Sequence, residues 1–307
     1  MLEQIQNKRR HPDWLKIRLP SSETYNEVRR LVSTNRLHTI CEEARCPNIF
    51  ECWSNGTATF LILGDICTRR CSYCHVKTGK PTELDLEEPK KVADAVKKLN
   101  LSYVVITSVT RDDLEDGGAL VYAETVKEIK NLMPHCSVEL LIPDFKSRAG
   151  DTIPKWCLNF DALKKVIEAK PDVLAHNIES VRRVFKSVRP GGNYDISLEL
   201  LRNIKDINPA MPTKSSIIFG LGENLEEIKQ TMLDLRSNKV DFLTLGQYLQ
   251  PSMKHAKIEK YYTPDEFKQL EEMAYELGFG HVEAGPLVRS SYRADKLAKK
   301  LYAVKMD

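Results

Sequence analysis

The chain has 307 residues, with 46 basic and 43 acidic side chains, 42% apolar residues and eight cysteines. This much apolar surface can offset the entropy of the chain, which excludes disordered, collagen-like and low-complexity proteins. A formal charge of +3 is too small to mark the whole chain as a nucleic-acid binder, and no apolar run reaches the roughly 18 residues of a membrane span.

The N-terminal stretch MLEQIQNKRRHPDW has no apolar core of the kind found in secretory signals. We therefore expect a cytoplasmic protein whose cysteines stay reduced, with thiolate chemistry or metal binding rather than disulfides.

The first 52 residues predict an N-terminal extension, because they do not join the alternation of strands and helices that follows. Within them, CEEARCPNIFEC places Cys41, Cys46 and Cys52 in a C-x4-C-x5-C run, which we expect to hold a metal cluster. The extension also has a basic excess, which indicates either an acidic partner or a solvated basic face: Lys8, Arg9, Arg10, Lys16, Arg18, Arg29, Arg30 and Arg36.

Seven short, nearly continuous apolar runs predict strands covered on both faces: 59–63, 103–107, 138–142, 173–176, 216–219, 241–245 and 281–283. Between them, apolar residues at intervals of three and four predict helices over 92–99, 119–129, 181–185, 225–235 and 267–277. The last helix has Thr263 and Glu266 as a capping box, Pro264 in its first turn and Gly278 at its end.

Repeated strand-then-helix order predicts right-handed parallel crossovers, and hence a doubly wound sheet or a (β/α) barrel. About six parallel βα units fall short of eight, so we prefer an α/β fold with an incomplete (β/α) barrel. We expect this core over residues 53–280, between the 1–52 extension and a C-terminal extension over 281–307. Chemistry in such a fold lies on loops at the C-terminal ends of the strands.

The stretch GDICTRRCSYCHV follows the first predicted strand and places Cys67, Cys71 and Cys74 on one C-x3-C-x2-C loop. Three thiolates can hold three irons of a cubane cluster and leave the fourth iron open to a small molecule. S-adenosylmethionine could chelate that iron through its amino and carboxylate groups. An electron would then cleave its sulfonium and release a 5′-deoxyadenosyl radical.

Three other interpretations compete for this loop. Zinc could take His75 as a fourth ligand, although no second pair of cysteines completes the usual knuckle. The residues CSYCH match a c-type haem attachment pattern, which leaves Cys67 unexplained and normally requires export. A disulfide is disfavoured in a reducing compartment.

The loop resembles the hallmark of radical S-adenosylmethionine enzymes, C-x3-C-x-aromatic-C, with Tyr73 as the aromatic residue. The resemblance implies cofactor contacts at Tyr73 beside the adenine, Thr107 near the methionyl amino group, Asn177 and Glu179 at the ribose, and Gly220 and Gly222 where the backbone approaches closely. Taken alone, the two glycines are typical of turns, and Asn177 and Glu179 could begin a helix.

Both cysteine motifs, together with RSSY near the C-terminus, resemble the lipoyl synthase family from PDWLKIRLP through VTRDDLEDGGA and RPGGNYDISL to RSSY. The resemblance implies a sulfurtransferase of lipoate biosynthesis, acting in protein lipoylation. Such an enzyme inserts two sulfur atoms at C6 and C8 of an octanoyl chain on a protein lysine, and consumes two S-adenosylmethionine molecules.

The resemblance further implies two [4Fe–4S] clusters. Cys67, Cys71 and Cys74 would hold the radical-generating cluster, while Cys41, Cys46 and Cys52 would hold an auxiliary cluster that supplies the sulfur. Its fourth ligand would be Ser291, with Ser290 as the second choice. A serine alkoxide is a poor match for iron compared with thiolate, so it could leave when the cluster opens.

Without the resemblance, the chemistry of the remaining candidate residues favours structural roles or leaves their role open. A serine pair near a C-terminus is usually a solvated loop or cap. Cys136 and Cys157 have no partner cysteine nearby in sequence and are expected to be small buried side chains. His176 could equally be structural or functional.

The expected partners are an octanoylated lipoyl carrier domain or H-protein, an electron donor such as ferredoxin or flavodoxin, and an iron–sulfur cluster carrier, without nucleic acid or membrane. One alternative is another radical sulfur-inserting enzyme, similar to biotin synthase or a methylthiotransferase. A non-enzymatic alternative is a zinc-binding interaction module.

Overall fold

The computed structural model describes residues 12–15, 22–35, 37–55, 57–148 and 156–294. Its main sheet has eight strands in the order β1-β2-β5-β6-β9-β10-β11-β12. The pairings from β2 to β12 are all parallel, whereas β1 pairs antiparallel with β2. The strands are β1 (His38–Thr39), β2 (Thr59–Ile62), β5 (Tyr103–Ser108), β6 (Ser137–Leu141), β9 (Val173–Ala175), β10 (Thr213–Phe219), β11 (Phe242–Gln247) and β12 (His281–Gly285).

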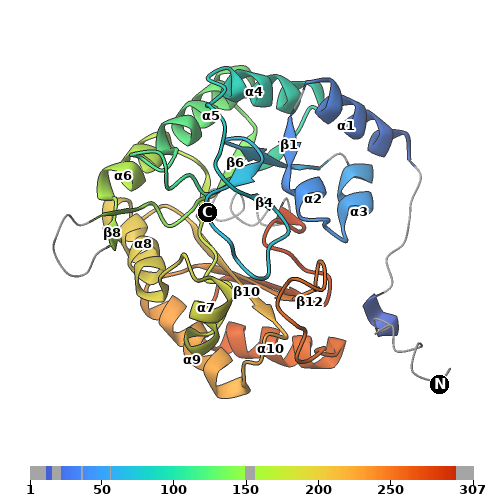
Figure 1. The fold of residues 1–307 in the computed structure, drawn as a ribbon, viewed down its shortest axis with the longest axis vertical. Helices are drawn as coiled ribbons and strands as arrows, with labels where there is room; N and C mark the ends of the chain where they lie inside the picture. The colour runs from blue at the N-terminus through green and yellow to red at the C-terminus, as the bar shows by residue number, and fades with distance from the viewer. Residues whose placement is uncertain (1–11, 16–21, 36, 56, 149–155, 295–307) are drawn as a thin grey trace, which may run out of the picture.

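Helices form an arc around the outside of these strands, with α1, α2 and α3 beside β1 (Figure 1). They are α1 (Glu23–Thr34), α2 (Ile40–Glu43), α3 (Ile49–Ser54), α4 (Glu88–Lys98), α5 (Ala119–Leu132), α6 (Phe160–Glu168), α7 (Arg182–Val188), α8 (Tyr194–Ile207), α9 (Leu225–Ser237) and α10 (Pro264–Glu276), with a short 3-10 helix η1 (Asp13–Leu15). Two small sheets join β3 (Ile66–Cys67) to β4 (Lys77–Thr78) and β7 (Lys146–Arg148) to β8 (Trp156–Leu158). No helix in these ranges is long and apolar enough to cross a membrane.

The predicted incomplete (β/α) barrel is confirmed, because seven parallel strands alternate with helices and β1 and β12 form the two edges of the described sheet. All seven predicted strands are present, and α10 has the predicted capping box of Thr263 and Glu266. Gly278 follows that helix with a φ of 90°, a left-handed conformation that glycine adopts without a Cβ penalty.

The structure also contains elements that the sequence did not predict. The N-terminal extension contributes β1, and α3 crosses the predicted boundary between residues 52 and 53. Helices α6 and α8 were not predicted, although Asn159 and Asn193 cap their N-termini through side-chain oxygens. The predicted division into extension, core and C-terminal segment stays a prediction.

The two faces of the strands differ. On β5, Val104 and Ile106 pack into the large core, whereas Tyr103 and Val105 form a small separate cluster with Ala294 of the C-terminal segment. The C-terminal segment therefore packs against the side of β5 that faces away from the main core.

A buried ion pair also crosses this sheet. Lys214 Nζ lies 2.7 Å from Glu139 Oε1, and the Tyr103 hydroxyl donates to Glu139 Oε2 at 2.5 Å. Both charged residues are almost completely buried. Because a buried carboxylate needs partners for its charge and lone pairs, the three residues form one unit that fixes β5, β6 and β10 relative to one another.

Candidate active site with two cysteine-lined cavities

The first cavity lies at the C-terminal ends of the parallel strands and has a volume of about 510 Å³. Its lining brings together the predicted cluster ligands Cys67, Cys71 and Cys74. The predicted cofactor contacts Tyr73, Thr107, Asn177 and Glu179 line the same cavity. This placement agrees with the rule that a barrel carries its chemistry on loops after the strands.

The cysteine loop is folded tightly between β3 and β4. The Cys74 amide donates to the Cys71 carbonyl at 3.1 Å, and the Gly79 amide donates to the Cys67 carbonyl at 3.0 Å. The Cys67 sulfur accepts two backbone amides at 3.4 Å, one from Arg69 and one from Thr110. Amides aimed at a sulfur stabilise its thiolate form and tune a bound cluster.

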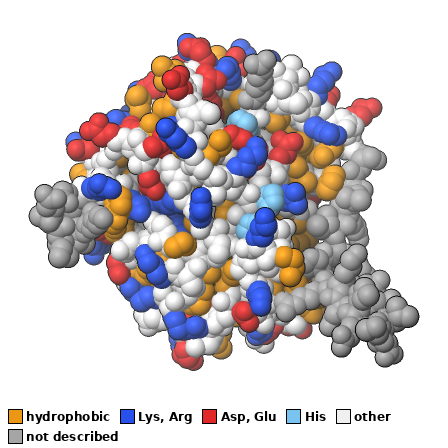
Figure 2. All heavy atoms as spheres, viewed as in Figure 1, with side chains coloured by type: hydrophobic (Ala, Val, Ile, Leu, Met, Phe, Trp, Pro, Cys, Tyr) orange, Lys and Arg blue, Asp and Glu red, His pale blue; other side chains and the backbone are white. Residues whose placement is uncertain are grey.

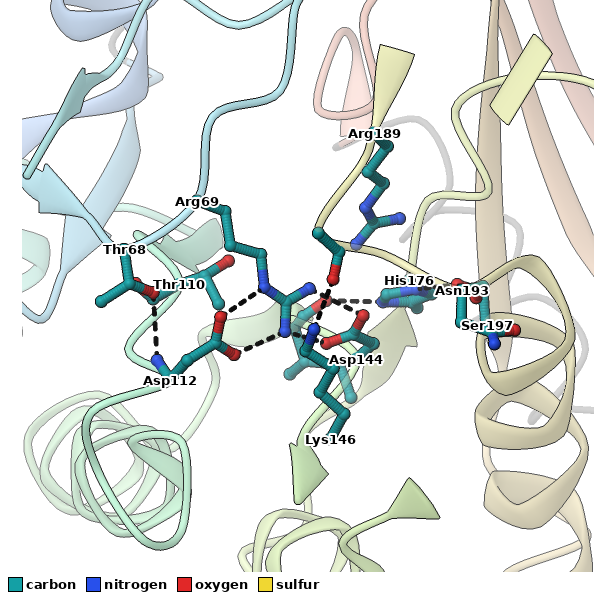
Figure 3. Close-up of polar contacts among 12 residues, drawn as sticks. Thr68, Arg69, Thr110, Asp112, Asp144, Lys146, His176, Arg189, Asn193 and Ser197 are labelled. Carbon is teal, nitrogen blue, oxygen red and sulfur yellow. Dashed lines mark hydrogen bonds and ion pairs between the residues drawn. The ribbon is translucent and has the colours of Figure 1, made fainter. Parts of the chain in front are cut away.

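Arg69 anchors this loop through an ionic network with one buried and one more exposed carboxylate (Figure 3). Its guanidinium donates two hydrogen bonds to Asp112, at 2.7 and 2.6 Å, and two to Asp144, at 2.7 and 2.6 Å. Asp144 is completely buried, which opposes its ionisation, but the Arg69 hydrogen bonds and charge lower the pKa of Asp144 to about 2. The segment between Cys67 and Cys71 is thus tied to the loops after β5 and β6.

His176 has a structural position beside this network (Figure 3). Its Nδ1 lies 2.8 Å from the Ile142 carbonyl oxygen, and its Nε2 lies 3.1 Å from the Ser197 hydroxyl. Burial and, to a smaller extent, the nearby Arg189 charge lower the pKa of His176 to about 4. The neutral ring therefore joins the ends of β6 and β9 to α8.

Among the described residues, two buried polar atoms of the first cavity have no hydrogen-bond partner. Asn177 Oδ1 and Ser108 Oγ are both buried, and both residues line the cavity. Buried polar atoms normally find a partner, so these two are available to a polar ligand. Glu179 reaches the same cavity from a residue with a φ of 68°, bridged to Ile217 of β10. The lining therefore fits a molecule with hydroxyl and ammonium groups, such as S-adenosylmethionine.

Gly220 and Gly222 do not line this cavity. Their φ angles are 100° and 97°, and a Cβ at Gly220 would lie 2.5 Å from the Lys260 carbonyl oxygen. The structure thus shows a turn and a close backbone contact at these glycines, and their contact with a cofactor stays a prediction.

A second cavity, of about 470 Å³, is lined by the other three cysteines, Cys41, Cys46 and Cys52, and by Ser291. Ser290 lines the first cavity instead. The serine residues come from the C-terminal segment, and the cysteines from α2, α3 and the turn between them. The fourfold ligand set inferred from sequence is therefore gathered in one place.

Contacts between distant parts of the chain build this second cavity. The Asn48 side chain donates to the Leu287 carbonyl at 2.6 Å, and the Tyr292 hydroxyl donates to Glu51 at 2.9 Å. Arg293 adds an ion pair with Glu51 at 3.5 Å. These contacts hold the C-terminal segment against α3.

Burial controls the protonation of the thiols. It raises the pKa of Cys41, Cys52 and Cys74 to about 12, and it raises the pKa of Cys46 and Cys71 in the same direction. Thiols of this kind release their protons when they bind a metal, because the thiolate is the ligand form.

Neither cysteine triplet has its three sulfur atoms within the distance expected of ligands to one ion. In the described part of the chain, one set of three candidate ligands has all its ligand atoms within 4.8 Å: His38, Glu43 and Asp65. Neither cysteine triplet is this tight. Ligands on one tetrahedral zinc at about 2.3 Å would lie roughly 3.8 Å apart. The thiols of either triplet would therefore have to move closer together to bind a single tetrahedral ion.

The two remaining cysteines lie outside both cavities. Cys136 is buried, as predicted, whereas Cys157 is only partly buried and its sulfur lies 3.6 Å from the Ser147 hydroxyl. Sequence reasoning missed the charged residues of the two sites, namely Arg69, Asp112, Asp144, Arg189 and Arg289. Some of these residues could have been found from the sequence, because Arg69 lies between two cysteines and others belong to the TRDD and RSSY stretches. No sequence pattern indicates Asp144.

Comparisons with known proteins agree with this geometry. The Radical SAM superfamily matches residues 61–235, and the N-terminal domain of lipoyl synthase of the Radical SAM family matches residues 1–46. A lipoyl synthase of Shouchella clausii is 54% identical over 94% of this chain and 90% of its own length. One from Bacillus subtilis is 53% identical over 94% of this chain and 93% of its own.

Solved structures show the fold alone. The FeFe-hydrogenase maturase HydG from Carboxydothermus hydrogenoformans aligns with a TM-score of 0.54 at 14% identity, over 92% of this chain and 78% of that one. Streptococcus suis SuiB bound to S-adenosylmethionine aligns with a TM-score of 0.51 at 11% identity, over 78% of this chain and 55% of that one.

The buried position of His176 predicts a pH-dependent stability. Its usual pKa of 6.5 falls to about 4 in the folded protein, so the stabilisation is complete above pH 6.5 and is lost as the pH falls towards 4. Urea unfolding at pH 7 and pH 5 should show a loss of about 2 kcal/mol from this group. His176→Gln should remove that part of the pH dependence, whereas Asp144 acts only below about pH 4. An unchanged pH dependence in the variant would show that His176 does not stay neutral.

Proposed function

Because the chain belongs to the lipoyl synthase family of radical S-adenosylmethionine enzymes, we propose that its first cavity generates the radical and its second cavity supplies the sulfur. The activity of the family, sulfur insertion into a protein-bound octanoyl group, replaces the alternatives of a biotin synthase-like enzyme, a methylthiotransferase and a zinc module. One observation carries the proposed division: Ser291 lines the same cavity as Cys41, Cys46 and Cys52.

The first cavity would bind S-adenosylmethionine beside a [4Fe–4S] cluster on Cys67, Cys71 and Cys74. When bound, that cluster supplies the electron that cleaves S-adenosylmethionine to methionine and a 5′-deoxyadenosyl radical. An alkyl C–H bond is too strong and too nonpolar for acid–base catalysis, so each sulfur insertion needs one such radical to remove hydrogen from C6 or C8. The task of the protein is therefore to hold the reactants and exclude water.

Residues around the cysteine loop perform that task. Arg69 is held by Asp112 and Asp144 and so fixes the cysteine loop against the segments that follow β5 and β6. The segment between β11 and α10 also contacts the cysteine loop. The Ala256 amide donates to the Ser72 carbonyl at 2.8 Å, and His255 Nε2 lies 3.1 Å from the Cys74 carbonyl oxygen. We assign Asn177 Oδ1 and Glu179 to the hydroxyl groups of the ribose and Thr107 to the methionyl end, with Tyr73 beside the adenine.

In the second cavity, Cys41, Cys46, Cys52 and Ser291 would hold an auxiliary [4Fe–4S] cluster as sulfur donor. Support for Ser291 over Ser290 comes from their opposite placement, since only Ser291 shares a cavity with these cysteines. A serine oxygen is the weakest of the four ligands for iron, which suits a site that must open.

The substrate would be an octanoylated lipoyl carrier domain or H-protein, and the structure offers a basic rim to an acidic domain. Arg45, Arg70, Lys254 and Lys257 are exposed beside residues of the first cavity and have no carboxylate within ion-pair distance in the described ranges. Lys and Arg side chains spread over the middle and lower part of the face in Figure 2. Of the basic residues predicted in the N-terminal extension, Arg29 and Arg30 are exposed on α1, and the other six lie outside the described residues.

The remaining partners follow from the chemistry. A one-electron donor such as ferredoxin or flavodoxin would reduce the first cluster, and an iron–sulfur cluster carrier would rebuild the second. We place these reactions in the cytoplasm, where glutathione and thioredoxin keep thiols reduced.

Iron analysis tests the two clusters. Under anaerobic conditions the protein should contain about eight irons and eight sulfides per chain, from two four-iron clusters. Combined alanine substitution of Cys41, Cys46 and Cys52 should leave about four irons, and so should combined substitution of Cys67, Cys71 and Cys74. Bound zinc, or eight irons in either triple variant, would refute the assignment.

Product analysis tests the division of labour with an octanoylated carrier peptide. Cys41→Ala should still form 5′-deoxyadenosine but no lipoyl product, whereas Cys71→Ala should lose both by at least about a hundredfold. Cys136→Ala, a buried cysteine outside both cavities, is the matched control and should retain both products. Equal loss of deoxyadenosine in Cys41→Ala and Cys71→Ala, with both variants folded by circular dichroism, would count against separate roles.

A further inference from the structure

Arg289 borders both cavities and is the only residue common to their described linings. The next two residues diverge, since Ser290 lines the first cavity and Ser291 the second. The segment presses closely on β11: a Cβ at Gly246 would lie 2.1 Å from the Val288 carbonyl oxygen and 3.5 Å from Arg289 Nη1. Residues 288–291 therefore form part of the wall between the radical site and the sulfur site.

The charge of Arg289 is not neutralised by a carboxylate. Its guanidinium donates to the Val288 carbonyl at 2.7 Å, and no acidic side chain of the described chain lies within 4.0 Å of it. The Arg289 side chain is partly buried and lines both cavities. Arg69, in the first cavity, provides the contrast, because two carboxylates surround it.

Arg293 is a second useful contrast within the same segment. It also lines the second cavity, but it pairs with Glu51 at 3.5 Å and its side chain is 45% exposed. The second cavity thus contains one cation that is already paired and one that is not.

A cation that is partly buried at a cavity wall and has no carboxylate partner among the described residues is unfavourable, so its position indicates where an anion is to bind. A [4Fe–4S] cluster with three thiolates and one alkoxide carries net negative charge. We propose that Arg289 is a positioning residue whose guanidinium is the counter-ion of the auxiliary cluster, held at the wall that this cluster shares with the S-adenosylmethionine cavity. This inference rests on the proposed second cluster.

Two consequences follow from a fixed cation at this wall. Opposite charge favours the more reduced, more negative form of a cluster, so Arg289 should raise the midpoint potential of the auxiliary cluster. It should also keep the sulfur donor close to the site where the substrate radical forms, so that hydrogen abstraction and sulfur insertion stay coupled.

The test uses the full chain with Cys67, Cys71 and Cys74 replaced by alanine, which should carry the auxiliary cluster alone. A dye-mediated dithionite titration followed by electron paramagnetic resonance would measure its midpoint potential in that protein and with Arg289→Met, Arg289→Lys and Arg293→Met added. Arg289→Met should retain about four irons and shift the potential to more negative values. Arg289→Lys should restore most of the shift, and Arg293→Met should shift the potential less than half as far.

The same substitutions in the wild-type background test coupling. Arg289→Met should raise the ratio of 5′-deoxyadenosine to lipoyl product at least fivefold, whereas Arg293→Met should raise it less than twofold. A potential and a ratio that do not respond to Arg289→Met would overturn the inference.

Two outcomes separate this inference from the proposed function. If the parent protein without Cys67, Cys71 and Cys74 contains no iron, the second cluster itself is refuted. If Arg289→Met loses iron, the iron content of Arg289→Lys and Arg289→Gln is compared. Iron binding that recovers with lysine alone supports a role of Arg289 as counter-ion, and equal loss of iron in both variants refutes that role.

Discussion

The contact between α3 and the C-terminal segment is the constraint on which the second half of the site depends. Asn48 binds Leu287, and Glu51 binds Tyr292 and Arg293, across separations of about 240 residues. Without these bonds, the first three cysteines would lie at the edge of the barrel with no serine facing them and no wall behind them. One set of polar contacts therefore holds together the walls of the second cavity, brings Ser291 to the same lining as the three cysteines and places Arg289 at both cavities.

The incomplete barrel makes this arrangement possible. Because β1 and β12 are the edges of the described sheet, the C-terminal segment can follow β12 and pack Ala294 against Tyr103 and Val105. The two cavities then have different electrostatics. In the first cavity, Arg69 is neutralised by Asp112 and Asp144 and fixes a loop, whereas Arg289, which also lines the second cavity, has no carboxylate partner among the described residues. Arginine is thus neutralised by carboxylates at one position and left with its charge unpaired by carboxylates of the described chain at the other.

Much of this organisation could be predicted from the sequence because it depends on residues that are close together in the chain. Seven apolar runs predicted seven strands, and spacing alone sorted six cysteines into two triplets. The features that were not predicted depend on residues far apart in the sequence. Asp144 is 75 residues from Arg69, and an ion pair between such distant residues produces no periodic pattern in the sequence. β1 has only two residues, and α6 and α8 were missed although their asparagine caps were visible. Turn geometry, and at Gly220 a close backbone contact, are what the structure shows at Gly220 and Gly222, and their contact with a cofactor stays a prediction.

The origin of the inserted sulfur is the most direct test of the central claim that the second cavity is a sulfur store. The protein would be reconstituted with sulfur-34 sulfide, freed of excess sulfide, and given one turnover with an octanoylated carrier peptide and S-adenosylmethionine. Mass spectrometry should then find sulfur-34 at both positions of the lipoyl group. Lipoyl product carrying sulfur of natural isotopic composition would contradict the claim, because the sulfur would then have come from outside the cluster.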